Sequence, residues 1–203
     1  MAGVAWQKPM DYTSLRYALS NRRDTSHVRR ALRLLAPTAG MRLLEVGCGR
    51  GFLTQCFQEQ GLDAVGIDAN PHAIQQGVAP NLFVMRAEKL DFPDASFDLL
   101  CSFHAIEHVP PIEQALAEMA RVVKPGGKLL ICYPAEPVKG LYAVPSAVIL
   151  YGDPTKAAEV HCHRITPRRL QKMAAGLPLE HLRSEFHLLR SPQFYSLFRR
   201  IGG

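Results

Sequence analysis

The stretch LLEVGCGRG, Leu43–Gly51, decides how this chain folds. An apolar run of strand length, Met41–Val46, leads into three glycines spaced G-x-G-x-G, and a helix-length segment follows from Phe52 to about Gln60. A strand, a glycine-rich turn and a helix in succession can hold a nucleotide-like ligand. Glycine lets the backbone approach the ligand closely, and the helix N-terminus presents free N–H groups. The sequence therefore predicts a ligand site at this turn.

The spacing of the glycines separates classes of ligand. A dinucleotide-binding fold has G-x-G-x-x-G, whose third glycine lets the helix pack closely on the strand beside a pyrophosphate. Phe52 stands where that third glycine would fall, so an NAD-dependent oxidoreductase is disfavoured. The chain also has no G-x-x-x-x-G-K-[ST] stretch, which excludes a P-loop.

Short apolar runs alternate with helix-length segments further along the chain, which is typical of βαβ units and a parallel sheet. The last two strands, 186–189 and 194–198, are expected to pair as an antiparallel hairpin through Ser191-Pro192. We therefore predict an α/β fold with a mostly parallel seven-stranded sheet and an antiparallel strand near the C-terminus. The elements expected in between are the strands 64–68, 82–85, 97–103 and 128–133 and the helices 70–77, 112–123 and 166–175.

The length of 203 residues suits one α/β domain. We expect an N-terminal helical extension over residues 1–40 and the main domain over 41–203. The chain has no run of about 18 apolar residues and no basic start followed by an apolar segment, so neither a membrane span nor a signal peptide is expected. The five cysteines form no C-x-x-C pair, which is typical of reduced thiols and of a cytoplasmic protein.

Charge is unevenly distributed along the chain. Residues 1–40 carry a net charge of +5 and residues 161–203 a net charge of +6, whereas the segment between them is acidic. Basic ends are compatible with an anionic substrate, a membrane surface or a nucleic acid, and equally with solvated helix faces.

Asp68 ends the second expected strand, and this position indicates a second anchor for the ligand. A carboxylate there can accept hydrogen bonds from both hydroxyls of a ribose. The alternative is that Asp68 only caps the helix that follows. The stretch Gly66–Pro71 favours the ligand, because it places Asp68 at the strand end that faces the same crevice as the glycine turn.

Four stretches in register resemble the successive motifs of class I S-adenosylmethionine-dependent methyltransferases. They are most similar to the small-molecule "type 11" group, which includes ubiquinone-biosynthesis O-methyltransferases, and together they cover about residues 41–133. The resemblance implies a Rossmann-like three-layer sandwich, S-adenosylmethionine as cofactor and S-adenosylhomocysteine as product. The four stretches are LEVGCGRG (44–51), VGID (65–68), AEKLDFPDASFD (87–98) and RVVKPGG (121–127).

The resemblance also implies which residues bind the cofactor. The glycine turn would lie along its methionyl and ribose parts, the end of the second strand would hold the ribose, and the third and fourth strands would border the adenine and the methionyl end. The residues concerned are Glu45, Gly47, Cys48, Gly49, Asp68, Ala69, Ala87, Glu88 and Phe103.

Arg86 departs from the pattern of this family. The family usually has Gly-Asp before the Ala-Glu pair, and that Asp accepts the exocyclic amine of adenine, whereas this chain has Met85-Arg86. An arginine side chain only donates hydrogen bonds, so it cannot replace the Asp. Either Glu88 substitutes or adenine recognition rests on backbone contacts and stacking. A cofactor-binding relative without activity stays an alternative.

His104-Ala105-Ile106-Glu107-His108 follows the fourth strand and supplies candidates for the catalytic base. As a bare pattern this is H-x-x-E-H of a zinc peptidase, but that motif needs to lie within a helix, and here Pro110-Pro111 follows at once. Histidine has a suitable pKa for deprotonating a hydroxyl acceptor. We expect the catalytic residue to be His104 first, then His108 or His161; for each of them a purely structural role is the alternative.

The same stretch raises the question of a metal ion. In ubiquinone-pathway and small-RNA 2′-O-methyltransferases, a Glu-x-x-Glu-His at this place binds a divalent ion. Here His104 replaces the first Glu, Glu107 and His108 match, and His161 or His163 could add a ligand. Such an imidazole-rich set would prefer zinc, iron or manganese to magnesium. A divalent metal is compatible with these residues but not favoured, because Glu-His before Val-Pro also occurs in metal-free relatives.

The acceptor is expected to be a small molecule, with O-methylation slightly preferred because of the histidines. The segment 134–165 falls where the family inserts its acceptor lid, and its apolar content fits an apolar part of the acceptor or a helix packed on the sheet. A nucleic-acid acceptor stays an alternative because of the basic ends, although no RNA-binding module is recognisable. The sequence gives no indication of the oligomeric state.

Overall fold

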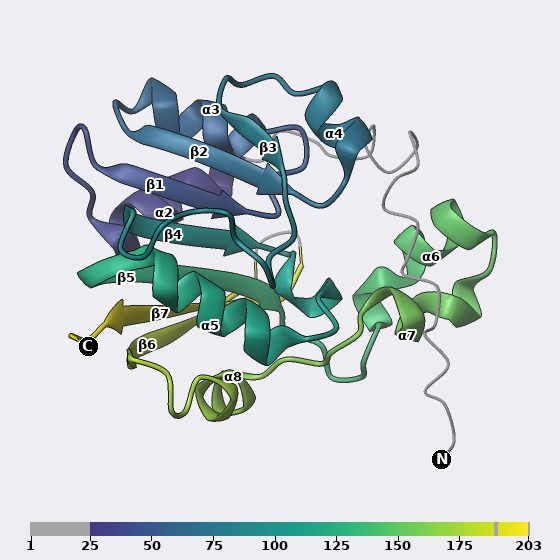
Figure 1. Ribbon diagram of the computed structural model, residues 1–203. Helices are drawn as coiled ribbons and strands as arrows, with labels where there is room; N and C mark the ends of the chain where they lie inside the picture. The colour runs from purple at the N-terminus through teal and green to yellow at the C-terminus, as the bar shows by residue number, and fades with distance from the viewer. Residues whose placement is uncertain (1–24, 189–190, 203) are drawn as a thin grey trace, which may run out of the picture.

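β1 (Arg42–Val46) is an interior strand of a seven-stranded sheet in the order β3-β2-β1-β4-β5-β7-β6 (Figure 1). The computed structural model describes residues 25–188 and 191–202. Strands β3, β2, β1, β4 and β5 are parallel, and β7 runs antiparallel between β5 and β6. The other strands are β2 (Asp63–Asp68), β3 (Leu82–Val84), β4 (Phe97–Phe103), β5 (Val123–Pro134), β6 (Leu179–His187) and β7 (Gln193–Arg200).

Helices cover both faces of this sheet, and the strands alternate between two apolar clusters. Leu43 of β1 packs with α2 (Thr25–Leu35) and α3 (Phe52–Glu59) on one face. Its neighbour Leu44 packs with α5 (Ile112–Val122) and α8 (Pro167–Met173) on the other. Successive side chains of a strand point to opposite faces, and a parallel sheet covered on both faces needs apolar residues on both. The predicted mostly parallel seven-stranded sheet, in a three-layer sandwich, is confirmed.

The helices follow the apolar periodicity of the sequence. In α5, Ile112, Ala115, Leu116 and Met119 are fully buried, at the spacing that lines one face of a helix. Asn70 begins the short helix α4 (Pro71–Gln75) by accepting hydrogen bonds from two backbone N–H groups of its first turn. In the same way, the Thr166 hydroxyl accepts from the backbone N–H of Arg169 at the start of α8.

The N-terminal helix α2 is part of the core. Val28, Ala31, Leu34 and Leu35 are buried against the sheet, and Lys128 of β5 donates a hydrogen bond of 2.8 Å to the carbonyl of Leu35. The rest of the expected N-terminal extension, residues 1–24, lies outside the described residues.

The C-terminal hairpin differs from the prediction in its first strand. β6 begins at Leu179, seven residues before the predicted strand 186–189, and Leu189 lies outside the described residues. β6 is the edge strand of the sheet, so its side chains alternate only weakly between buried and exposed. The periodicity that identifies an interior strand is therefore missing from its sequence.

A helical insertion, residues 134–165, lies beyond the end of the sheet to which the arrowheads of β1, β2 and β4 point (Figure 1). It contains α6 (Val144–Tyr151), α7 (Ala157–Val160) and the 3-10 turns η2 (Leu141–Ala143) and η3 (Pro154–Lys156), and a further turn, η1 (Ile106–His108), precedes α5. The insertion has a small apolar cluster of its own. Several of its large apolar side chains are exposed: Val138, Leu141, Val144, Val148 and Ile149.

Within the described part of the chain, no helix combines the length and the apolar character that crossing a membrane requires.

Gly47 connects β1 to the glycine turn in a conformation that only glycine adopts without strain. Its φ is +81°, and a Cβ placed on it would lie 2.2 Å from the Cβ of Ala105, which follows β4. The turn can therefore lie directly against the end of β4 only because this position carries no side chain.

We expect Gly47→Ala to lower the free energy of unfolding by more than Gly40→Ala. Gly40 has the same φ of +81° but no atom within 4 Å of an added Cβ, so its substitution measures backbone strain alone, about 1–2 kcal/mol. Gly47→Ala adds the collision with Ala105. Urea denaturation of the two variants and the parent measures the difference, and equal losses in both variants would show that Ala105 moves aside without cost.

Candidate functional site

The carboxyl ends of β1, β2 and β4 meet at one edge of the sheet, because these strands are parallel neighbours. In open α/β sheets this edge is where ligands bind. The glycine turn follows β1, Asp68 ends β2, and Phe103 ends β4. The topology thus brings together most of the residues that the sequence indicates for the cofactor.

Asp68 ties the glycine turn to the end of β2. One carboxylate oxygen accepts a hydrogen bond of 2.7 Å from the Gly49 N–H, and the other accepts one of 2.8 Å from the Asn70 N–H. Burial raises the pKa of Asp68, although these two bonds favour the ionised form. Each carboxylate oxygen has a second lone pair, so Asp68 can still accept from ribose hydroxyls. The alternative of a simple helix cap does not describe it, because Asn70 caps α4.

Glu45 lies beneath the turn as a buried acid. It is 2% exposed, and one of its oxygens accepts a hydrogen bond of 2.5 Å from the Thr54 hydroxyl. Burial, reinforced by the negative charge of Asp68, raises the pKa of Glu45 to about 8 against the opposing effect of the Thr54 bond. The carboxyl group is therefore mostly protonated at neutral pH until a cation comes near. Thr54, in the first turn of α3, is a partner that the sequence reading missed.

The thiol of Cys48 is buried within the turn, and burial raises its pKa well above the ordinary value. A protonated, enclosed thiol is a poor nucleophile. Cys48 therefore contributes backbone and packing to the turn rather than covalent chemistry.

The side expected to hold adenine contains an internal ion pair. Arg86 Nε donates a hydrogen bond of 2.5 Å to Oε1 of Glu88, and Ala87 between them is buried. Ala69, after β2, is exposed. The guanidinium of Arg86 thus fixes the direction of Glu88, and the second oxygen of Glu88 can still accept a hydrogen bond.

The three candidate catalytic histidines surround Glu107. The Nδ1 atom of His104 lies 3.5 Å and the Nε2 atom of His108 lies 3.9 Å from Oε1 of Glu107. The ring of His161, which comes from the insertion, lies 4.9 Å from that of His108. The structure therefore brings His161 to the histidines after β4 across more than fifty residues of chain.

Each imidazole also has an outer partner from a different element. His104 Nε2 lies 2.7 Å from the amide oxygen of Gln193, His108 Nδ1 lies 2.7 Å from the carbonyl of Val160, and His161 Nδ1 lies 2.9 Å from a carboxylate oxygen of Glu136. Glu136 is itself held by the backbone N–H groups of Gly140 and Tyr142. No local motif links these outer partners to the histidines, so they could not be predicted from the sequence.

Glu107 is an unusual buried charge. It is 1% exposed, and neither of its carboxylate oxygens has a hydrogen-bond partner among the described residues. Burial raises the pKa of Glu107, but the three nearby imidazoles outweigh burial and hold the pKa below its usual value. The imidazoles of His104 and His108, 3.5 and 3.9 Å away, offset part of the cost of burying this charge, and the carboxylate oxygens keep unused capacity to accept hydrogen bonds.

Exposure distinguishes the three histidines. The side chain of His104 is 32% exposed, against 13% for His108 and 7% for His161. His104 is therefore the ring that a bound molecule reaches most directly. His163 does not join the group, because its ring contacts the carbonyls of Val109 and Pro110.

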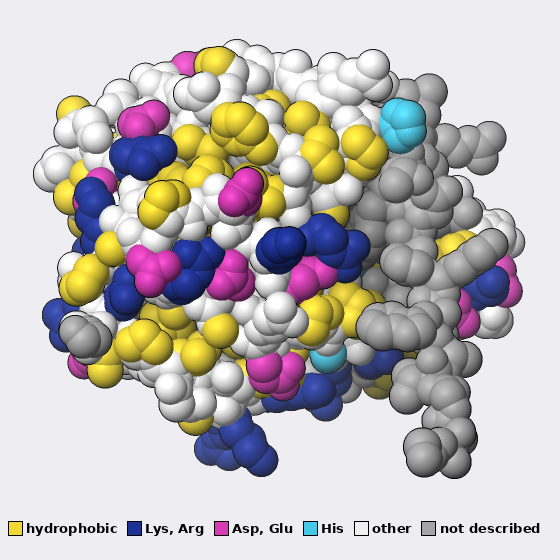
Figure 2. Space-filling model, viewed as in Figure 1, with side chains coloured by type: hydrophobic (Ala, Val, Ile, Leu, Met, Phe, Trp, Pro, Cys, Tyr) yellow, Lys and Arg dark blue, Asp and Glu magenta, His cyan; other side chains and the backbone are white. Residues whose placement is uncertain are grey.

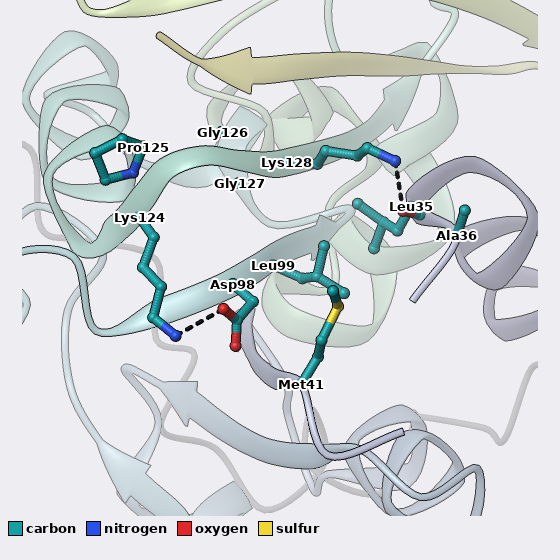
Figure 3. Close-up of a pocket in the computed structure, with 10 residues that line it drawn as sticks. All are labelled: Leu35, Ala36, Met41, Asp98, Leu99, Lys124, Pro125, Gly126, Gly127 and Lys128. Atoms are coloured by element: carbon teal, nitrogen blue, oxygen red, sulfur yellow. Dashed lines mark hydrogen bonds and ion pairs between the residues drawn. The ribbon is translucent and has the colours of Figure 1, made fainter. Parts of the chain in front are cut away.

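A hollow of about 310 Å³ elsewhere on the protein lies at the opposite edge of the sheet (Figure 3). It is bordered by Met41 before β1, Asp98 near the start of β4 and Lys124. Figure 3 shows Lys124 pointing to Asp98, with 2.6 Å between the ammonium and the carboxylate. Because it opens at the amino ends of the strands, this hollow is separate from the candidate cofactor site.

The basic residues near the two chain ends are partly neutralised within the protein. Arg30 and Arg33 of α2 both pair with Glu185 of β6, and Arg199 pairs with Glu180. On the face seen in Figure 2, charged side chains of both signs lie in a band between apolar patches. These pairings weaken the case for an extended phosphate-binding surface.

Comparison of this sequence with known proteins finds methyltransferases. The model of the methyltransferase-domain family matches residues 44–131. A ubiquinone biosynthesis O-methyltransferase of Aeromonas salmonicida is 32% identical over 168 residues, which cover 76% of this chain and 70% of that protein. A protein of the same name from Paramagnetospirillum magneticum is 34% identical, covering 59% of this chain and 51% of its own. A demethylmenaquinone methyltransferase of Tropheryma whipplei is 33% identical, covering 60% and 53%.

Solved structures share the fold at lower identity. A putative methyltransferase in complex with the Haloferax volcanii Trm112 activator superimposes with a TM-score of 0.76 at 14% identity, over 96% of this chain and 98% of that chain. The YcgJ protein of Bacillus subtilis gives a TM-score of 0.68 at 17% identity, over 89% and 100%. The chain spans about half the length of the Paramagnetospirillum and Tropheryma relatives.

We expect Glu45 to make the stability of the ligand-free protein depend on pH. The pKa of Glu45 is raised to about 8 in the folded state, so its contribution is fully present below the unfolded pKa, near 4.5, and is lost as the pH rises toward 8. Each pKa unit corresponds to about 1.4 kcal/mol. The free energy of unfolding of the parent should therefore fall relative to that of Glu45→Gln between pH 5 and 8, as measured by urea denaturation. A difference that stays constant with pH would contradict the raised pKa.

Proposed function

The chain belongs to the methyltransferase-domain family, and on that basis we propose that it transfers a methyl group from S-adenosylmethionine to a small-molecule acceptor. The observation that carries the proposal is the bond between Asp68 and Gly49. This bond supports the proposal because it holds a carboxylate that can accept hydrogen bonds from ribose hydroxyls beside a glycine turn at the carboxyl edge of the sheet.

In this proposal the cofactor lies across the ends of β1, β2 and β4. Asp68 accepts from the ribose hydroxyls, and the backbone of Gly47, Cys48 and Gly49 lines the methionyl and ribose parts. Ala69 and Ala87 border the adenine, where Glu88, oriented by Arg86, takes the place of the family's usual acceptor. Phe103 borders the methionyl end.

Glu45 is proposed to meet the positively charged amino group of the cofactor. A cation at this place favours the ionised carboxylate, so binding would lower the raised pKa of Glu45 and release a proton. While it is protonated, Glu45 would attract other molecules only weakly. It would attract the cofactor once the positively charged amino group has made it lose its proton.

The acceptor side of the proposal rests on His104. A hydroxyl oxygen of the acceptor attacks the methyl carbon, the carbon–sulfur bond breaks, and its electron pair stays on sulfur to give S-adenosylhomocysteine. The hydroxyl proton passes to His104, whose side chain is the most exposed of the three candidates. Alignment of the two reactants supplies most of the rate enhancement, because the sulfonium is already a good leaving group.

The surroundings of His104 support the role of a base. Burial lowers the pKa of His104, but the Cys132 thiol and the Glu107 carboxylate outweigh burial and raise the pKa above its usual value. Only the neutral ring can accept the proton of the acceptor, so in this proposal turnover increases as the pH rises through the raised pKa of His104. The Glu107 carboxylate, 3.5 Å from Nδ1, stabilises the positive charge that the ring gains.

The insertion supports an acceptor with an apolar part. Its exposed side chains Val138, Leu141, Val148 and Ile149 lie in the segment that also carries His161. An aromatic or prenylated hydroxyl compound fits this combination of apolar surface and imidazole. A cytoplasmic setting is proposed with it, on the basis of the five free thiols.

A divalent ion is a second candidate for activating the acceptor, and the residues present fit one. Ligand atoms of Glu107, His108 and His161 lie within 4.8 Å of one another, and the Glu107 oxygens accept no hydrogen bond from the described residues. The contacts of His108 with the Val160 carbonyl and of His161 with Glu136 are of the kind that orient metal-binding imidazoles. Such an ion would act as a Lewis acid on the acceptor hydroxyl.

We expect Asp68→Ala to weaken the binding of S-adenosylmethionine and S-adenosylhomocysteine by about tenfold or more, because hydrogen bonds from ribose to a charged group are lost. Titration calorimetry measures both affinities. Asp63→Ala is the matched control, since Asp63 starts the same strand, is exposed and pairs with Arg42 at the opposite edge. Equal affinities in the parent and Asp68→Ala would overturn the cofactor site.

We expect His104→Gln to lower turnover about a hundredfold, the usual effect of losing a general base, with unchanged S-adenosylhomocysteine affinity. A screen over phenols, catechols, quinols and RNA, read out as S-adenosylhomocysteine formed, supplies the assay. EDTA should leave turnover unchanged if the base acts without a metal. Loss of turnover in EDTA with recovery in Mn²⁺ or Zn²⁺, absent in His161→Phe, would instead establish the metal.

A further inference from the structure

We propose that Gln193 is a positioning residue for His104, and that Tyr195 and His27 behind it help to fix the tautomer of the neutral His104 ring. This inference rests on the function proposed above, in which His104 faces the acceptor. All three residues lie outside the segment 44–131 that matches the family, so the family's motifs do not include them.

A continuous line of polar contacts runs from His104 through the protein. His104 Nε2 lies 2.7 Å from the Gln193 amide oxygen, the Gln193 amide nitrogen donates to the Tyr195 hydroxyl at 3.0 Å, and that hydroxyl lies 2.9 Å from His27 Nδ1. Gln193 is 5% and Tyr195 2% exposed. The line joins the end of β4, the start of β7 and the N-terminal helix α2.

The chemistry of an amide gives this line a direction. An amide donates only through nitrogen and accepts only through oxygen. Because the Gln193 nitrogen donates to Tyr195, its oxygen faces His104 and requires an N–H there. The Tyr195 hydroxyl accepts from Gln193 and makes a second hydrogen bond with Nδ1 of His27, whose donor depends on the tautomer of His27.

This direction determines the tautomer of His104. The hydrogen bond to the Gln193 oxygen places the ring proton on Nε2, so Nδ1 carries the lone pair of the neutral ring. Nδ1 is also the atom that lies 3.5 Å from Glu107. Without Gln193 the ring of His104 could flip, so that either nitrogen faces Glu107. Only one of these two orientations places the basic lone pair on the Glu107 side.

The back of the site holds the ring in place. His104 has a φ of +51°, a left-handed backbone conformation that is uncommon for residues other than glycine, and its N–H donates to the Cys132 carbonyl at 3.0 Å. The ring of His27 packs 5.0 Å from that of Phe103 and 5.6 Å from that of His104. The Cys132 thiol also lies near, 3.7 Å from His104 Nε2, and donates weakly to the Gln193 oxygen.

Nitrogen-15 NMR of the ligand-free, histidine-labelled protein tests the proposal, with the signals of His104 assigned by their loss in His104→Gln. The spectra are followed to a pH above the raised pKa of His104, where the ring is neutral and carries a single ring proton. There we expect the Nε2–H tautomer in the parent. In Gln193→Leu, which keeps the volume and removes the acceptor, we expect a mixture of tautomers. Gln193→Glu retains an acceptor and should restore Nε2–H. Finding Nδ1–H in the parent, or Nε2–H unchanged in Gln193→Leu, would overturn the proposal.

Two tyrosine variants test the second part of the line. Tyr195→Phe removes the hydroxyl that orients the amide, so His104 should again show mixed tautomers. Tyr133→Phe is the matched control, because Tyr133 is equally buried and its hydroxyl bonds to Ser196 instead. Identical spectra for the two variants would remove Tyr195 from the proposal and leave Gln193 to be judged by its own variants.

Kinetics separates positioning from a merely structural role. Gln193→Leu should lower kcat about tenfold or more, as expected when a catalytic imidazole takes the wrong tautomer, while the KM for S-adenosylmethionine and the S-adenosylhomocysteine affinity stay the same. A structural role would lower Tm without this split. Failure of the parent to bind S-adenosylhomocysteine would refute the proposed function, whereas the tautomer in the ligand-free protein is measured independently of it.

Discussion

The carboxylate of Asp68 joins two turns that follow different strands. One oxygen holds the backbone of Gly49 after β1, and the other holds the backbone of Asn70 after β2. The turn is held further by its first two N–H groups, which both donate to the Ile67 carbonyl, and by the Val78 N–H, which donates to the Arg50 carbonyl. The position of the helix that follows the turn, and with it the cofactor edge of the sheet, depends on this shared acid.

Two buried acids at this edge are left in different electrostatic states. Glu45 is buried near the negative charge of Asp68, and these two effects outweigh its bond from Thr54, so its raised pKa keeps it mostly neutral. Glu107 is equally buried but faces three imidazoles, so its lowered pKa keeps it ionised. The environment of Glu45 suits a positively charged cofactor, and the environment of Glu107 suits a proton taken from the acceptor. Two carboxyl groups of the same chemistry can thus serve two different functions.

Much of the fold and part of the site could be predicted from the sequence, because the signals concerned are local. A strand, a G-x-G-x-G turn and a helix are contiguous, and Asp68 could be placed by its position at the end of a strand. The edge strand β6 was predicted too short, since its mixed sequence lacks the alternation of an interior strand. Gln193, Tyr195, His27 and Glu136 could not be predicted, because their partners are distant in sequence and only the topology brings them together.

The reversed direction of β7 has a consequence for how the two ends of the chain share one site. Because β7 runs against its neighbours, its first residue rather than its last reaches the carboxyl edge, and Gln193 and Tyr195, two positions apart, share a face of the sheet. A slip of one residue in the pairing with β5 would turn both side chains to the opposite face. The geometry behind His104 is thus tied to the register of the C-terminal hairpin. Insertions or deletions between β6 and β7 that shift the pairing of β7 would therefore displace Gln193 and Tyr195 and disturb His104 at the carboxyl end of β4.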